Sequence, residues 1–258
     1  MESNAQPIIG VLGGMGPYAG LDLVQKVFDE TMAGSDQEHL PVALLSYSHR
    51  IKDRSAYILG EIANNPAYAI ADVATGLDRL GVRVAGIPCN SAHAPAIYDV
   101  LRHTLRASGR RIRILHLIQE AVRFVREAMP HVQRIGPLST LSVHRIGLYR
   151  DAIEAAGFDA VMPEAAVADS VHRSIFTPEI GIKAQSNPVT AEARQLVLDG
   201  VRHLRDKGAQ AVILGCTELP LAVTETHSEG VLLVDATRAL ARALIRETYP
   251  EKLAPLGP

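Results

Sequence analysis

The sequence predicts an α/β fold made of two similar lobes, each built on a parallel sheet. Short apolar runs typical of strands alternate along the whole chain with stretches of helical period, which is the pattern of parallel α/β architecture. Two of these runs each end just before a cysteine, and the surroundings of the two cysteines repeat at nearly the same spacing. With 258 residues and 47% apolar composition, the chain is long enough for one or two domains.

The first strand and helix have clear signals. An apolar run at residues 8–12 predicts a strand, and Pro17 begins the helix that follows, because proline suits the first turn of a helix. This helix is expected to end near Gly34. Its expected inward face consists of Leu21, Val24 and Phe28. A second strand is expected at residues 42–46.

The next elements lead to the first cysteine. After a loop at residues 64–66, a stretch of helical period is expected to stop at Gly81, a residue type that commonly ends helices. Its expected inward residues are Ile70, Val73, Leu77 and Leu80. The apolar run 84–87 then predicts the strand that delivers Cys89.

The second half repeats this order of elements. Strands are expected at 132–138 and 158–162, with a helix that ends at Gly157 between them. A long helix is closed by Gly208, and the strand 211–214 delivers the second cysteine. Two further strands, one after each cysteine and each leading into a helix, are expected at 112–116 and 231–235.

This repetition indicates an ancient duplication. Gly10 precedes Cys89 by 79 residues, and Gly136 precedes Cys216 by 80 residues. If the two halves face each other about a pseudo-twofold axis, each contributes its cysteine to one shared cleft from opposite sides. The expected lobes are residues 1–108 plus 225–258, carrying Cys89, and residues 109–224, carrying Cys216.

Each cysteine is expected in the first turn region of a helix, among small and polar residues. The polar neighbours are Asn90 and Ser91 after Cys89, and Thr217 and Glu218 after Cys216. A thiol at a helix N-terminus has a lowered pKa, because it feels the positive end of the helix dipole. We therefore expect two free thiols that exchange protons near neutral pH.

Composition and charge exclude several classes of protein. A net charge of −2 gives no general attraction to nucleic acid or anionic lipid, and no apolar run approaches the roughly eighteen residues of a membrane span. The 10 histidines lack a metal-type spacing, so no metal site is expected. The glycine cluster at residues 13–16 departs from a dinucleotide-binding fingerprint. The N-terminus lacks the features of a secretory signal, so we expect a cytoplasmic protein.

Five short motifs occur in an order that is shared with a known family. They are Gly13-Gly14-Met15-Gly16-Pro17, Asp36-Gln37-Glu38-His39, Asp53-Arg54, Pro88-Cys89-Asn90-Ser91-Ala92-His93 and Gly215-Cys216-Thr217-Glu218. From about residue 8 to about residue 245, the chain resembles the aspartate/glutamate racemase superfamily, in particular its aspartate racemase branch. The resemblance implies two Rossmann-like lobes with the active site in the cleft between them. It also implies a homodimer and a reaction that uses neither pyridoxal phosphate nor a metal.

The resemblance implies a cofactor-independent racemase that interconverts L- and D-aspartate, or glutamate. Inverting a carbon centre by proton exchange requires a base on one face and an acid on the other, and Cys89 and Cys216 are expected in these roles. The implied substrate-binding residues are Met15, Arg54, Asn90, Ser91, Thr140, Lys183, Thr217 and Glu218. Of these, Arg54 and Lys183 are the candidates for anchoring a second carboxylate.

Departures from the family pattern leave the substrate open. The usual Asn-Pro before the Asp-Arg pair is replaced by residues 48–52, and Val143 stands where a threonine is usual. Aspartate is the first choice, followed by glutamate and then by a less common amino acid. Two other functions stay open: an isomerase or decarboxylase of a dicarboxylic acid, such as a maleate isomerase, and a non-catalytic amino-acid sensor. His93 is interpreted as a structural histidine.

Overall fold

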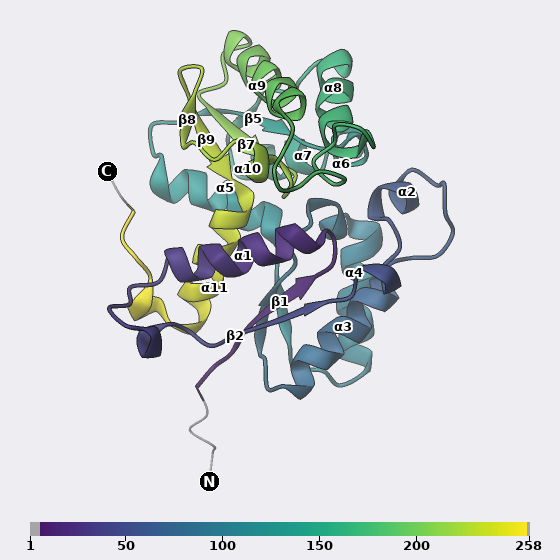
Figure 1. Ribbon diagram of the computed structural model, residues 1–258, viewed down its shortest axis with the longest axis vertical. Coiled ribbons are helices and arrows are strands. Elements are labelled where there is room, and N and C mark those ends of the chain that lie inside the picture. Colours follow the sequence, from purple (N-terminus) through teal and green to yellow (C-terminus); the bar gives the residue numbers. More distant parts are fainter. Residues whose placement is uncertain (1–5, 257–258) are drawn as a thin grey trace.

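The computed structural model describes residues 6–256, so residues 1–5 and 257–258 of the expected first lobe lie outside it. Two lobes are stacked along the long axis, with the first at the bottom of Figure 1 and the second at the top. Over the described range, the first lobe contains a four-stranded sheet and the second a five-stranded sheet. None of the helices within residues 6–256 combines the length and apolarity needed to span a membrane.

The first sheet is parallel and has the strand order β2-β1-β3-β4. Its strands are β1 (Ile9–Gly13), β2 (Val42–Ser46), β3 (Val84–Gly86) and β4 (Arg113–Leu115). The helices of this part of the chain are α1 (Pro17–Asp29), α2 (Arg54–Ile58), α3 (Ala67–Arg79), α4 (Pro95–Ala107) and α5 (Leu117–Ala128).

The second sheet has the strand order β6-β5-β7-β9-β8, with β8 antiparallel to β9 and the other pairs parallel. Its strands are β5 (Arg134–Leu138), β6 (Asp159–Ala160), β7 (Ala211–Leu214), β8 (His227–Ser228) and β9 (Val231–Asp235). The accompanying helices are α6 (Leu141–Arg145), α7 (Leu148–Ala155), α8 (Ala165–Phe176), α9 (Ala191–Asp206), α10 (Leu219–Ala222) and α11 (Ala236–Thr248).

The two sheets repeat one arrangement. The order β2-β1-β3-β4 in the first corresponds to β6-β5-β7-β9 in the second. Cys89 follows β3 and Cys216 follows β7, so the cysteines occupy corresponding positions at the carboxyl ends of central strands, where α/β folds bind ligands. The prediction of two similar α/β lobes with parallel sheets is confirmed.

The strand pairing corrects the expected lobe boundaries at two places. Residues 113–115, expected in the second lobe, form β4 and pair with β3 in the first sheet. Residues 231–235, expected in the first lobe, form β9 and pair with β7 in the second sheet. The reason is that each lobe takes the strand that directly follows its own cysteine-bearing segment, and strands that follow one another in sequence usually lie side by side.

The last helix crosses back to the first lobe. In Figure 1, α11 lies beside α1 in the lower lobe, although β9 directly before it belongs to the upper sheet. Leu240 and Leu244 of α11 pack so closely on Gly86 of β3 that a Cβ there would lie 2.9 Å from Leu240 Cδ2. Glu30, directly after α1, accepts hydrogen bonds from Arg238 and Arg242 of α11.

The buried face of α1 differs from the expectation, whereas that of α3 largely agrees. In α1, Leu23 and Val27 are fully buried and Leu21 is 56% exposed. Gly20 causes the difference, because its lack of a side chain lets the helix approach Leu44 of β2 closely. The helix also ends at Asp29 and not near Gly34. The predicted inward residues Ile70, Val73 and Leu77 of α3 are buried, whereas Leu80 lies beyond the helix end and is exposed.

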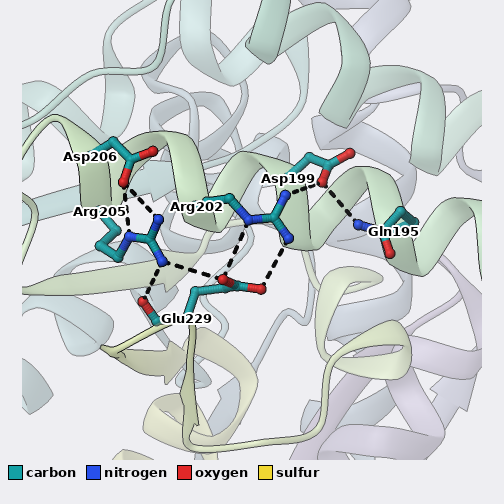
Figure 2. Close-up of polar contacts among 6 residues, drawn as sticks. All are labelled: Gln195, Asp199, Arg202, Arg205, Asp206 and Glu229. Carbon is teal, nitrogen blue, oxygen red and sulfur yellow. Dashed lines mark hydrogen bonds and ion pairs between the residues drawn. The ribbon is translucent and has the colours of Figure 1, made fainter.

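The β8–β9 hairpin is tied to α9 by a group of charged side chains (Figure 2). Glu229, in the hairpin turn with a φ of 53°, accepts hydrogen bonds from Arg202 at 3.1 Å and from Arg205 at 3.3 Å. Asp199 and Asp206 accept from the same two arginines. Isolated surface ion pairs contribute little to stability, but these side chains share partners, so each ion pair restrains the side chains of the next. The network fixes the edge of the second sheet next to β9.

Candidate active site

A cavity lies between the two lobes, at the carboxyl ends of β3 and β7. Its lining residues are Met15, Asp53, Arg54, Ser55, Cys89, Asn90, Ser91, Thr140, Phe176, Lys183, Cys216, Thr217 and Glu218. All ten residues that the sequence assigns to the site are among them. Both cysteines are free thiols and almost fully buried. The structure therefore brings the two thiols to one enclosed space.

The backbone of Cys89 is hydrogen-bonded to the buried ring of His93. Its Sγ is 3.5 Å from the hydroxyl of Ser91. His93 Nδ1 donates to the carbonyl of Cys89 at 2.9 Å, and its Nε2 lies 3.3 Å from the carbonyl of Leu115. Burial and the nearby ring of His116 lower the pKa of His93 to about 3, so the ring is neutral at physiological pH. These surroundings are those of a structural histidine.

Cys216 is coupled to a buried ion pair. Its Sγ donates a hydrogen bond to Glu218 Oε2 at 2.9 Å, and Glu218 Oε1 accepts one from Lys183 Nζ at 2.7 Å. Burial would raise the pKa of Glu218, but the Lys183 ammonium, the hydrogen bonds from Cys216 and Lys183, and the charge of Arg54 together hold it below its usual value. Burial and the Glu218 carboxylate together raise the pKa of Cys216 well above its usual range. Cys216 is therefore a protonated thiol in this arrangement.

This environment overturns the expected lowering of the Cys216 pKa by a helix dipole. The helix after Cys216, α10, has only 4 residues, so few peptide dipoles are aligned toward the sulfur. The sulfur instead faces the carboxylate of Glu218 in a site from which water is excluded. Desolvation and a neighbouring anion both disfavour a thiolate, and they dominate here.

Arg54 places a buried positive charge on the side of Cys89. The side chain is 6% exposed, and it donates to the carbonyls of Lys52 at 3.1 Å and Met15 at 3.3 Å. Within residues 6–256 its Nε has no hydrogen-bond partner. Burial would lower the pKa of Arg54, but the Cys89 sulfur, followed by Asp53, raises it above its usual value. The guanidinium thus lies beside Cys89 and keeps one donor without a partner among the described residues.

Asn90 is held across the lobe boundary by Tyr149. The hydroxyl of Tyr149, in α7 of the second lobe, donates to Asn90 Oδ1 at 2.6 Å. Both side chains are buried, with Asn90 3% and Tyr149 1% exposed. The other end of the Asn90 amide, Nδ2, has no partner among the described residues. Asn90 therefore presents an unused donor beside the cavity.

Two further hydrogen bonds join the lobes around the cavity. Thr217 Oγ1 donates to the carbonyl of Pro88 at 3.0 Å. Ser142 Oγ donates to Ser55 Oγ at 2.9 Å, and Ser142 is itself 3.0 Å from Thr140 Oγ1. Because all of these groups are buried, the bonds hold the two lobes in one closed arrangement around the thiols.

Several cavity residues carried no clear sequence signal. Ser55 follows the Asp-Arg pair without belonging to it. Phe176 also lines the cavity, and Lys183 Nζ lies over its ring, 5.4 Å from the centroid. Tyr149 does not line the cavity but donates a hydrogen bond to Asn90, which does. The glycine before Cys216 was consistent with a close approach of another group, and the structure shows that this group is the Tyr149 ring, since a Cβ at Gly215 would lie 2.5 Å from it.

The arrangement is suited to proton transfer at an anionic carbon acid. Two thiols reach one space from the two lobes, and Arg54 and Asn90, which also line it, each keep a donor without a partner among the described residues. Within residues 6–256, no group of three or more histidine, cysteine or acidic side chains is arranged to hold a metal ion.

Fold and cavity together define a two-lobed α/β protein of the kind found among amino-acid racemases. An aspartate racemase from Picrophilus torridus superposes with a TM-score of 0.78 at 23% identity, covering 96% of each chain. A glutamate racemase from Francisella tularensis, solved with D-glutamate, superposes with a TM-score of 0.66 at 17% identity, covering 98% of this chain and 84% of that chain. At these identities the likeness shows the fold.

The sequence identifies the family. Residues 12–244 match the Asp/Glu/Hydantoin racemase family, so the chain belongs to it. It is 22% identical over 254 residues to the broad specificity amino-acid racemase RacX of Bacillus subtilis, covering 94% of this chain and 98% of that relative. A glutamate racemase from Beutenbergia cavernae is 29% identical over 196 residues, covering 75% of this chain and 62% of that protein.

Proposed function

We propose that this protein is an amino-acid racemase that interconverts the L and D forms of aspartate or glutamate without pyridoxal phosphate or a metal. The observation that carries this proposal is the pair of free, buried thiols, Cys89 and Cys216, which line one cavity from corresponding positions in two repeated lobes. Such a pair supplies a proton acceptor on one face of Cα and a proton donor on the other.

We assign the two thiols different roles. Cys216 keeps its proton because burial and Glu218 raise its pKa, so it serves as the acid. Cys89 lines the cavity from the other lobe, beside the buried Arg54 guanidinium, and we assign it the role of the base. Cys89 takes the Cα proton and becomes a thiol, and Cys216 delivers its proton to the opposite face and becomes a thiolate. The return reaction uses the same groups in reverse.

Lys183 makes the second state accessible. Once Cys216 has lost its proton, its thiolate faces the carboxylate of Glu218 at hydrogen-bonding distance. The Lys183 ammonium, 2.7 Å from Glu218 Oε1, lowers the pKa of Cys216 and so offsets part of this repulsion. The ion pair thus keeps Cys216 protonated at rest without preventing its ionisation during turnover.

Donors without a hydrogen-bond partner are available to stabilise the anion that forms when the Cα proton leaves. Removing the Cα proton places additional negative charge on the α-carboxylate oxygens, and donors that are already in position stabilise this charge without reorganising. Asn90 Nδ2 and Arg54 Nε are buried donors without partners among the described residues, and both side chains line the cavity. They are our candidates for the α-carboxylate.

The side chain of the substrate extends toward a neighbouring hollow. A second cavity of about 460 Å³ shares Arg54, Lys183 and Glu218 with the first and extends toward Pro17 and Tyr18 of α1. The side-chain carboxylate of aspartate or glutamate fits a site with these two cations, although Glu218 already neutralises one of them. From the family resemblance we also propose a homodimer, which light scattering of the purified protein tests.

Proton exchange in heavy water tests the proposal. Purified protein is incubated in D₂O with L-aspartate, L-glutamate and a panel of other L-amino acids, while NMR follows the loss of the Cα proton and chiral chromatography follows the D enantiomer. Cys89→Ala and Cys216→Ala should each abolish racemisation while retaining the fold.

Three results would contradict a racemase that uses two thiols. Absence of exchange with every amino acid, from folded protein that still binds one of them, would indicate a sensor. A covalent substrate adduct on a cysteine, detected by mass spectrometry, would indicate the isomerase chemistry in which sulfur attacks carbon. Full racemisation by either single-cysteine variant would refute the two-thiol mechanism.

A further inference from the structure

Tyr149 connects the neighbours of both cavity thiols while lining no part of the cavity itself. It lies in α7 of the second lobe, where its hydroxyl reaches Asn90, the residue directly after Cys89. Its ring packs against Gly215, the residue directly before Cys216, so closely that a Cβ there would lie 2.5 Å from Tyr149 Cε2.

The hydrogen bond from Tyr149 decides which end of the Asn90 amide is presented to the cavity. An asparagine amide has an accepting oxygen at one end and a donating nitrogen at the other, and the two ends are similar in size. Burial raises the pKa of Tyr149 well above its usual value, so its phenol keeps its proton and donates to Oδ1. The oxygen is thereby occupied, and the cavity is left with the donor end, Nδ2.

We propose that Tyr149 is a positioning residue for catalysis, which fixes the Asn90 amide so that Nδ2 donates to the α-carboxylate of the substrate. The inference rests on the proposed racemase function, because it assigns Nδ2 to the anion that forms there. Without the phenol, the amide is free to turn and present Oδ1 to the carboxylate, where two acceptors repel each other.

Tyr149→Phe removes the hydroxyl and keeps the ring against Gly215. Charge on the carboxylate increases as the Cα proton leaves, so the donor matters more in the transition state than in the bound substrate. We expect kcat to fall at least about tenfold and KM to rise by no more than about threefold. A purely structural role would change stability without this division between kcat and KM.

Tyr98→Phe is the matched control. Tyr98 is also buried, at 8% exposure, and its hydroxyl donates to a backbone carbonyl, that of Ile114, at 2.7 Å. It does not line the thiol cavity. Removing this hydroxyl deletes one buried hydrogen bond, as in Tyr149→Phe, so the two variants should lose similar stability. Only Tyr149→Phe should lose kcat.

A double-mutant cycle tests whether Tyr149 acts through Asn90. The variants are Tyr149→Phe, Asn90→Ala and the combination of the two. If the phenol serves only to orient the amide, the combined variant should be no slower than Asn90→Ala alone, because there is no amide left to orient. Losses that multiply, or a kcat for Tyr149→Phe equal to that of wild type, would overturn the proposal.

A binding measurement separates this inference from the proposed function. Succinate, an inert dicarboxylate, is titrated calorimetrically into the wild type and both tyrosine variants. If the wild type binds succinate but exchanges no Cα proton, the racemase proposal fails. A weakening of succinate binding confined to Tyr149→Phe, within the threefold limit set for KM, would still support the oriented amide, and equal affinity in all three proteins would overturn it. A wild type that neither exchanges nor binds succinate would overturn both.

Discussion

Replacing Glu218 by glutamine should lower the pKa of Cys216. The substitution keeps an acceptor for the thiol and removes the negative charge whose oxygen lies 2.9 Å from Sγ, while the Lys183 ammonium stays. Since burial is unchanged, the remaining cation then favours the thiolate. The direction of the shift follows from which charge is removed and does not depend on its size.

Coulomb's law bounds the magnitude. A full charge at 2.9 Å, with an effective dielectric constant near 20, corresponds to about 6 kcal/mol, and about 1.4 kcal/mol corresponds to one pKa unit. The carboxylate charge is shared between two oxygens and is already partly neutralised by Lys183, so the net effect is well below this bound. We expect a fall of about two pKa units.

The pKa is measurable on the only remaining thiol. In a Cys89→Ser background the chain keeps one of its 2 cysteines, and the ¹³Cβ shift of labelled cysteine then reports the titration of Cys216 alone. Glu225→Gln is the control, because it makes the same chemical change at an exposed ion pair with Arg194. An unchanged or higher pKa in Glu218→Gln would refute the assignment of Glu218 as the group that holds Cys216 protonated.

Three further substitutions probe the fold. Glu30→Gln leaves two arginines of α11 without their buried carboxylate, so the free energy of unfolding measured in urea should fall by about 3 kcal/mol. A fall of less than about 1 kcal/mol would contradict a buried ion pair. Burial raises the pKa of Asp22 to about 6, so the protonated carboxyl contributes its full stability below about pH 4, and this contribution is lost as pH rises through 6. Between these two pH values the wild type should lose about 2 kcal/mol of unfolding free energy relative to Asp22→Asn. Parallel pH profiles of stability for the two proteins would refute this expectation. Gly215→Ala forces a Cβ to within 2.5 Å of Tyr149 and should lower stability by about 1–3 kcal/mol, whereas wild-type stability would show that the ring yields freely.

The fold and the positions of the two cysteines could be predicted because their causes are local. Each cysteine directly follows a short apolar strand, and parallel strands of this type present their carboxyl ends at one edge of a sheet. The repeated spacing from Gly10 to Cys89 and from Gly136 to Cys216 then implied two equivalent edges. This pattern led to the cysteines and their polar neighbours, whereas more distant cavity residues such as Arg54 and Lys183 were expected only from the family resemblance.

The electrostatics of the cavity depend on contacts that sequence neighbours do not determine. Lys183 pairs with Glu218 from 35 positions earlier in the chain, and Tyr149 donates to Asn90 across 59 positions. Cys216 therefore has a raised pKa, although its place before a helix predicts a lowered one. The prediction of the buried face of α1 was wrong for a similar reason. Gly20 allows α1 to approach Leu44 closely, and hydrophobic periodicity carries no information about such a contact.

The crossing of α11 into the first lobe has a consequence for biosynthesis. The N-terminal half leaves the ribosome first, yet its apolar surface around Gly86 is covered by Leu240 and Leu244, which lie close to the end of the chain. Domains usually fold in the order in which they are synthesised, and unfinished ones are prone to aggregation. Here the earliest part to emerge must wait for the last helix, so a nascent chain arrested after Asp235 should still expose that surface even though both cysteines have already been translated.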